Sequence, residues 1–121
     1  MSKFHYITIE SWMVSNLGLR GDELLIYAII YGFSQHNNNF FTGSSRYLSF
    51  WTGKTKETML KDLKKLRNKG LIARKKKVSN INENRYFCDY YATITRFPEE
   101  DQEKVIHNWS KYSPPLFPQE D

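Results

Sequence analysis

The chain has 121 residues and a formal net charge of +5, with 40% hydrophobic and 16% aromatic residues. This length suits one domain with a substantial core, and this composition excludes a disordered tail. No apolar run approaches the roughly 20 residues of a membrane span, and the N-terminal segment MSKFHYITIE lacks the apolar core of a signal peptide. Cys88 is the only cysteine, which excludes an intrachain disulfide, so a reducing, cytoplasmic location is expected.

Positive charge is concentrated in the middle of the chain. Residues 44–91 hold 13 Lys and Arg against 4 Asp and Glu, whereas residues 1–43 and 92–121 are both slightly acidic. Such concentration is typical of a surface that binds the phosphates of a nucleic acid. A solvated helix surface is the alternative explanation of a Lys-rich stretch.

The N-terminal segment is rich in apolar residues. Residues 4–17 predict a short extended start followed by a helical turn or two. Within this segment, Ile7, Ile9, Trp12 and Met13 are expected to belong to the core.

A longer helix is predicted from Asp22 to about Ser34. Its acidic first turn is favourable at the positive end of the helix dipole. The run LLIYAIIY that follows contains no charged residue. A helix that is apolar on nearly every side usually lies at the centre of a core.

Two helices separated by a short turn are predicted next. Residues 46–51 form the first, with Ser44 or Ser45 as its cap. Gly53 breaks that helix, and Thr55 is a good N-cap for the second. Such a short gap with a glycine in it is typical of a helix-turn-helix.

The helix that starts at Thr55 has one apolar face and several basic ones. Met59, Leu63 and Leu66 recur at helical spacing and form an apolar stripe. Gly70 suits the left-handed residue that ends many helices. This pattern is typical of a recognition helix in a DNA-binding protein.

A β-hairpin is predicted directly after this helix. Residues 71–78 and 85–92 have the pattern of two strands, and the Asn-rich segment between them suits a hairpin loop. The first strand carries four consecutive basic residues, which we expect to be presented rather than buried. With residues 40–42 as a third strand, the hairpin predicts the small antiparallel sheet of a winged helix-turn-helix.

A C-terminal helix completes the prediction. Pro98 and the acidic residues after it suit a helix start, and residues 97–112 form an amphipathic helix. A Pro-rich, acidic tail follows at residues 113–121. The predicted fold is therefore α+β and mainly α, with a winged helix-turn-helix domain over residues 1–96. The C-terminal helix either packs on its own domain or pairs with a second copy.

The chain resembles winged helix-turn-helix domains of Gram-positive bacteria and of their phages and plasmids. The similarity is carried by ITIESWM, by LRGDELLIYAIIYGFSQ and by FFTGSSRYLSFWTGKTKETMLKDLKKLRNKGLI. In particular, it looks like the N-terminal domain of phage replisome-organiser and replication-initiator proteins. The resemblance implies a DNA-binding role in replication or in transcription control.

DNA contacts are expected from the start of the recognition helix, which ordinarily enters the major groove, and from basic residues around it. The predicted DNA-binding residues are Ser45, Arg46, Lys54, Thr55, Lys56, Glu57, Lys61, Lys64, Arg74, Lys75, Lys76, Lys77 and Arg85. For Ser45 and Arg46 the alternative role is helix capping, and for Lys64 it is solvent exposure alone. Leu60 either contacts a thymine methyl group or packs against the preceding helix.

Residue types that carry catalysis or bind metals are scattered. His5, His36 and His107 fall in different predicted elements and lack cysteine partners, so neither a metal site nor a cofactor is expected. Cys88 is expected to be a small packed residue. The sequence contains neither a Gly-rich phosphate loop nor a hydrolase motif, and the protein is not expected to be an enzyme.

Two functions fit these observations. The first is a double-stranded DNA-binding factor in replication initiation or transcription regulation of a phage, plasmid or other mobile element. The alternative is an interaction module that binds an acidic surface of a replisome or host-defence protein. The basic recognition helix favours DNA. A homodimer through residues 98–112 is also expected, because one winged helix covers few base pairs.

Overall fold

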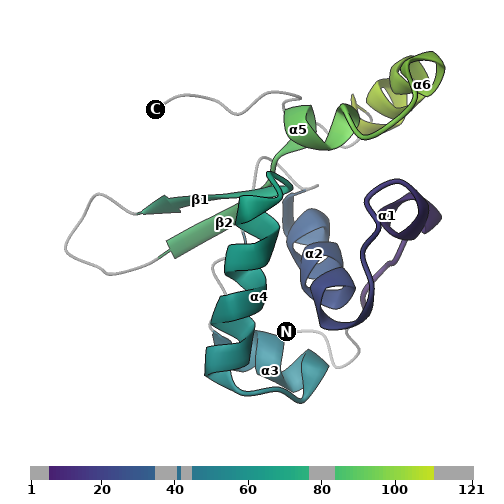
Figure 1. Cartoon of the computed structure of the whole chain (residues 1–121). Helices are drawn as coiled ribbons and strands as arrows, with labels where there is room; N and C mark the ends of the chain where they lie inside the picture. Colours follow the sequence, from purple (N-terminus) through teal and green to yellow (C-terminus); the bar gives the residue numbers. More distant parts are fainter. Residues whose placement is uncertain (1–5, 35–40, 42–44, 77–83, 111–121) are drawn as a thin grey trace.

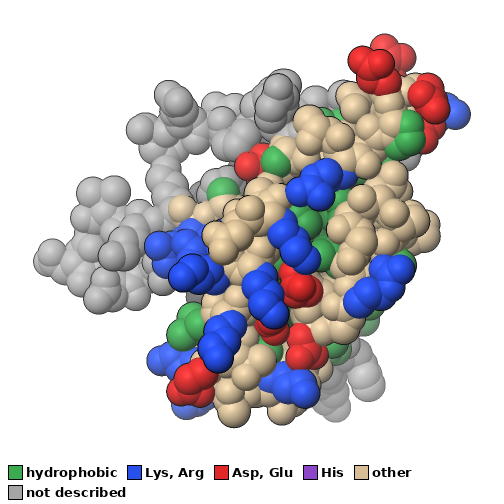
Figure 2. All heavy atoms as spheres, in the orientation of Figure 1, with side chains coloured by type: hydrophobic (Ala, Val, Ile, Leu, Met, Phe, Trp, Pro, Cys, Tyr) green, Lys and Arg blue, Asp and Glu red, His purple; other side chains and the backbone are tan. Residues whose placement is uncertain are grey.

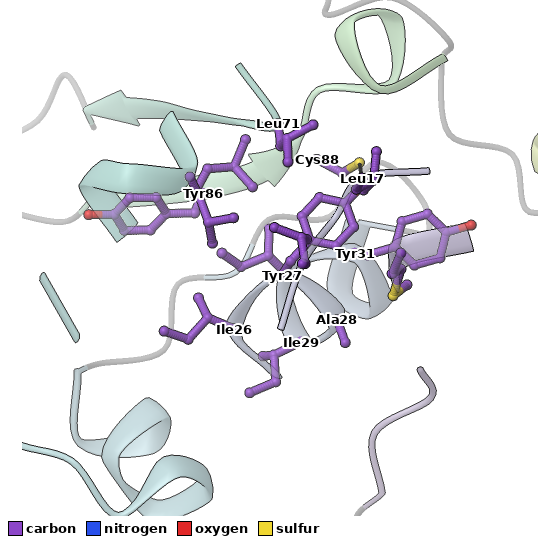
Figure 3. Close-up of a cluster of buried hydrophobic side chains, with 14 of the residues drawn as sticks. Leu17, Ile26, Tyr27, Ala28, Ile29, Tyr31, Leu71, Tyr86 and Cys88 are labelled. Carbon is purple, nitrogen blue, oxygen red and sulfur yellow. Dashed lines mark hydrogen bonds between the residues drawn. The ribbon is translucent and has the colours of Figure 1, made fainter. Parts of the chain in front are cut away.

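A long buried helix organises the fold. The computed structural model describes residues 6–34, 41, 45–76 and 84–110, and Figure 1 shows their arrangement. Helix α1 (Ser11–Ser15) and helix α2 (Gly21–Ser34) come first. Every residue of α2 from Ile26 to Tyr31 is buried, as the uninterrupted apolar run predicted. Figure 3 shows the core, in which α2 side chains lie against Leu17, Leu71, Tyr86 and Cys88.

The predicted helix-turn-helix is present as α3 (Ser45–Thr52) and α4 (Lys56–Asn68). Between them, Gly53 has a φ of +72°, a conformation that residues with a Cβ seldom adopt. Leu48 from α3 and Met59 from α4 are both buried, so the two helices close over the same core as α2.

A small antiparallel sheet follows α4. Strand β1 (Ile72–Lys76) pairs with β2 (Asn84–Cys88), with Ile72 opposite Cys88. Phe41 joins β2 through a single bridge to Tyr86, with backbone N···O distances of 2.7 Å and 3.0 Å. Two antiparallel strands are thus present within the region of the predicted hairpin. Of the predicted third strand, only Phe41 lies among the described residues, and it forms an isolated bridge.

The second strand ends four residues earlier than predicted. It ends at Cys88, and Tyr90–Ile94 form a short helix, α5, instead of continuing the strand. The cause is Asp89, whose carboxylate accepts a hydrogen bond from the backbone N–H of Ala92 at 3.0 Å and caps the new helix.

One predicted core residue is exposed. Ile9 keeps 45% of its surface accessible, whereas Ile7 and Trp12 pack against the core and Met13 is fully buried. The chain turns into α1 just after Ile9, so side chains from inside α1 fill the core and Ile9 stays outside it.

The predicted C-terminal helix is present as α6 (Glu99–Ser110), which begins two residues later than the predicted start at residue 97. It is joined to the domain through Phe97, which is buried, and through Val105, which packs partly against the core. The end of the predicted helix and the tail at residues 113–121 lie outside the described residues.

Candidate nucleic-acid interface

Helix α4 is bounded by specific local interactions. The hydroxyl of Thr55 accepts a hydrogen bond from the backbone N–H of Thr58 at 3.3 Å, which confirms the predicted N-cap. At the other end, Gly70 has a φ of +79° and reverses the chain direction before β1. Both ends of the helix are therefore defined by residues that the sequence identified.

The face of α4 opposite the core is a continuous polar stripe. Met59, Leu63 and Leu66 are buried, as predicted. A residue two positions further along lies about 200° around the helix, so Lys61 points away from Met59. Glu57, Lys61, Lys64 and Asn68, at spacings of four, three and four, are all exposed on that side. This set is called the outer stripe below.

One flank of α4 faces helix α2. The Nζ atom of Lys69, just past the end of α4, lies 2.8 Å from a carboxylate oxygen of Glu23 near the start of α2. Asp62 is buried on the same flank. Burial raises the pKa of Asp62; Lys65 counteracts this rise, whereas Asp22 and Glu23 add to it. On this flank the ammonium group of Lys69 is therefore engaged within the domain.

The opposite flank of α4 carries Lys56, Leu60 and Arg67. Leu60 follows Lys56 by four residues and precedes Arg67 by seven, so the three lie along one line of the helix. Leu60 is 47% exposed, which favours a surface role over packing against α3, the two roles that the sequence left open for this residue. This set is called the hairpin-side flank below.

The turn before α4 presents two further predicted residues. The backbone N–H of Lys54 donates to the hydroxyl of Thr52 at 3.2 Å, and that hydroxyl in turn donates to the carbonyl of Leu48 at 2.9 Å. These bonds hold the turn while the side chains of Lys54 and Thr55 remain exposed. Lys54 thus stands at the positive end of the α4 dipole, where an anion is favoured.

Helix α3 contributes Ser45 and Arg46 at its start. Ser45 is half-buried and Arg46 is exposed. Phe50, one turn after Arg46 on the same face, is 77% exposed, a feature that the sequence analysis did not single out. The sequence signal for this exposure is spacing: Phe50 lies four residues after Arg46 and two residues after the buried Leu48.

For most of the DNA-binding residues predicted in the hairpin, the structure gives the backbone pairing. Arg74 is exposed on β1. In the ladder, Lys75 is paired with Arg85 and Lys76 with Asn84. Lys77 lies outside the described residues. The hairpin therefore brings several basic residues together beside the recognition helix, on the side of α4 away from α2 (Figure 1).

Basic side chains outnumber acidic ones along α4. Figure 2 shows a row of basic side chains there, with a few acidic ones between them, and a second group of acidic side chains on α6. The exposed acidic residues of that helix include Glu99, Glu100 and Glu103. A polyanion is therefore attracted to the α4 side of the domain and repelled by the α6 end.

Helices α3 and α4, joined by the Gly53 turn, have the arrangement of a helix-turn-helix, in which two helices are joined by a short turn that often contains glycine. Residues 17–72 match the model of a family described as a helix-turn-helix domain. This match covers α2, α3 and α4 and ends at the first residue of β1. No curated protein and no solved structure matched the chain.

The described part of the chain contains no helix with the length and hydropathy needed to cross a membrane. The same residues contain no group of His, Cys, Asp and Glu side chains arranged to hold a metal ion.

Proposed function

We propose that the protein is a double-stranded DNA-binding winged helix-turn-helix factor that acts in replication initiation or transcription control of a phage, plasmid or other mobile element. In this proposal α4 enters the major groove and the β1–β2 hairpin serves as the wing. Binding and positioning on DNA, rather than catalysis, is its activity.

The outer stripe of α4 is the observation that carries this proposal. Lys61 and Lys64 are exposed there, and no described carboxylate forms an ion pair with either of them. Lys69, by contrast, is engaged by Glu23. Basic side chains that form no ion pair with a carboxylate of their own domain are available to contact bases and phosphates.

A matched pair of substitutions tests the proposal. Lys61→Ala and Lys69→Ala each remove one positive charge, the first within α4 and the second just past its end, so they change the net charge equally. We expect Lys61→Ala to lower affinity for a preferred duplex by about tenfold, because it loses a groove contact worth roughly 1–3 kcal/mol. Lys69→Ala should change affinity by less than about threefold, since its ammonium group serves a surface ion pair.

The measurement is fluorescence anisotropy with a preferred duplex, selected from a random library, and with a scrambled duplex. Equal losses for the two variants would mean that net charge alone drives binding, and the recognition-helix assignment would then be wrong. Binding that is weak and indifferent to sequence in the unmodified protein would instead favour a protein partner.

An interaction module remains the second candidate. The observation in its favour is Phe50, an aromatic side chain that is 77% exposed on α3. Exposed aromatic residues are enriched at protein interfaces. Under this alternative the basic surface binds an acidic protein of a replisome or of host defence, and Phe50→Ala would abolish capture of that protein without changing duplex affinity.

A further inference from the structure

Arg67, in the last turn of α4, is a half-buried cation without a partner among the described residues. Its Nε atom is buried, and no described group accepts a hydrogen bond from it. No described carboxylate forms an ion pair with its guanidinium either. Arg67 is not among the DNA-binding residues predicted from the sequence.

Two other arginines of the domain donate hydrogen bonds to backbone carbonyls of the domain itself. The guanidinium of Arg96 donates to the carbonyl of Lys69 at 2.7 Å. That of Arg20 donates to the carbonyls of Val14 and Leu19 at 3.1 Å and 2.8 Å. Arg67 differs from both, since the described residues offer its Nε no such carbonyl.

The position of Arg67 on α4 is also informative. It lies on the hairpin-side flank with Lys56 and Leu60, away from the flank that Glu23 engages. Eleven residues separate it from Lys56, which corresponds to roughly 16 Å of helix. The major groove is only about 12 Å wide. If the start of α4 lies in the groove, Arg67 lies near the edge of the groove, next to the backbone phosphates.

A guanidinium in this environment suits a phosphate. Partial burial without an anion is costly for a cation, and a phosphate would remove that cost. The planar fork of Arg donates two parallel hydrogen bonds to phosphate oxygens. A purely structural role, in which the methylene stem packs and the charge is incidental, is the competing explanation.

We propose that Arg67 binds a backbone phosphate of duplex DNA, so that the contact surface of α4 extends along the hairpin-side flank to the end of the helix. This inference rests on the proposed function. It assigns Arg67 to positioning on DNA and not to reading the bases, because phosphates carry no sequence information.

The test compares Arg67→Met and Arg67→Lys with the unmodified protein on preferred and scrambled duplexes over a range of salt concentrations. Arg67→Met keeps an apolar stem of similar length and removes the charge. We expect it to lower affinity about tenfold on both duplexes, the effect of one lost charge-assisted contact. The slope of log K against log salt should become shallower by about 0.9. Arg67→Lys should restore the slope and only part of the affinity, because an ammonium group lacks the fork.

Denaturant unfolding of the same variants separates the two roles of Arg67. A binding role predicts that Arg67→Met unfolds at the same or a higher denaturant concentration, since it removes an unpartnered cation. Earlier unfolding with an unchanged salt slope would overturn the proposal in favour of a structural role. Normal DNA binding by Arg67→Met would refute this inference alone, whereas absence of duplex binding in the unmodified protein would refute the proposed function and this inference together.

Discussion

At the scale of single residues, the structure gives the physical reason why Cys88 is a packed residue. The residue was expected to be small and packed, and it is 2% exposed. Its Sγ lies 3.1 Å from the hydroxyl of Tyr27, and its backbone N–H donates to the hydroxyl of Ser34 at 2.9 Å. Tyr27 also lies 3.3 Å from the hydroxyl of Thr93. This buried network joins α2 to β2 and α5.

Burial makes this thiol unreactive. It raises the pKa of Cys88 to about 12, although hydrogen bonds from Tyr27 and Thr93 counteract the rise. Near pH 8.5, where about half of an unfolded cysteine is thiolate, the native thiol stays protonated. We expect alkylation by iodoacetamide to be more than about a hundredfold slower in the native protein than in urea, because the thiolate is the nucleophile. Mass spectrometry of timed samples measures both rates, and comparable rates would show that the thiol is accessible.

The same rise in the pKa of Cys88 makes the stability of the protein fall as the pH becomes alkaline. The folded pKa of Cys88 lies above the unfolded value, so its contribution to stability is complete below about pH 8.5. That contribution is lost as pH rises toward the folded pKa of about 12. Tyr27, whose pKa is also raised by burial, acts in the same direction.

At the scale of elements, the seating of α4 on α2 determines which charges remain free for a ligand. Lys69 is held by Glu23, and Asp62 is buried on the same flank. Lys61 and Lys64, on the outer stripe, have no such partner among the described residues. Local periodicity identifies the apolar stripe of α4 but does not distinguish these two groups of lysines.

Replacement of Asp62 by Asn tests the electrostatics of this interface. The folded pKa of Asp62 is raised, so its ionisation lowers stability as pH rises from the unfolded value of about 3.9 toward the folded one. We expect Asp62→Asn to raise the urea midpoint at neutral pH and to leave it nearly unchanged near pH 3. Glu57→Gln, on the exposed outer stripe, is the control and should show no comparable gain. An equal midpoint for Asp62→Asn and the unmodified protein at neutral pH would contradict the buried-carboxylate account.

Helix α5 illustrates a local signal that pattern reading missed. The run RYFCDYYA is aromatic enough to predict a strand throughout, but Asp89 places a side-chain acceptor three residues before Ala92. An Asp at that spacing is an N-cap signal as well as a strand breaker. Helix capping therefore outweighed the strand preference of the aromatic residues.

At the scale of the whole molecule, the oligomeric state remains a prediction. A single helix-turn-helix covers a short site, so two half-sites held by a dimer would increase selectivity. The proposed dimer interface is the helix predicted over residues 98–112, of which α6 covers Glu99–Ser110.

Sedimentation equilibrium tests this prediction. We expect a dimer at micromolar concentration, and we expect Trp109→Ala to shift it to monomer while Phe50→Ala leaves it dimeric. The protein should then bind a duplex with two half-sites more tightly than one with a single half-site, because the second contact becomes intramolecular. A monomer at high concentration would eliminate the dimer and leave the DNA-binding proposal standing.

The sequence by itself determined helices α2, α3, α4 and α6, the N-cap of α4 and the helix-turn-helix. These features depend on short-range physics: the spacing of Met59, Leu63 and Leu66, the hydroxyl of Thr55 and the positive φ of Gly70. Only the tertiary structure decided which polar side chains of α4 remain free. Glu23 is 46 residues away from Lys69 in the chain, and their ion pair exists only because α2 and α4 pack together. The partnerless state of Arg67 is likewise a property of the packed domain, since partial burial and the lack of an acceptor arise only when distant segments meet.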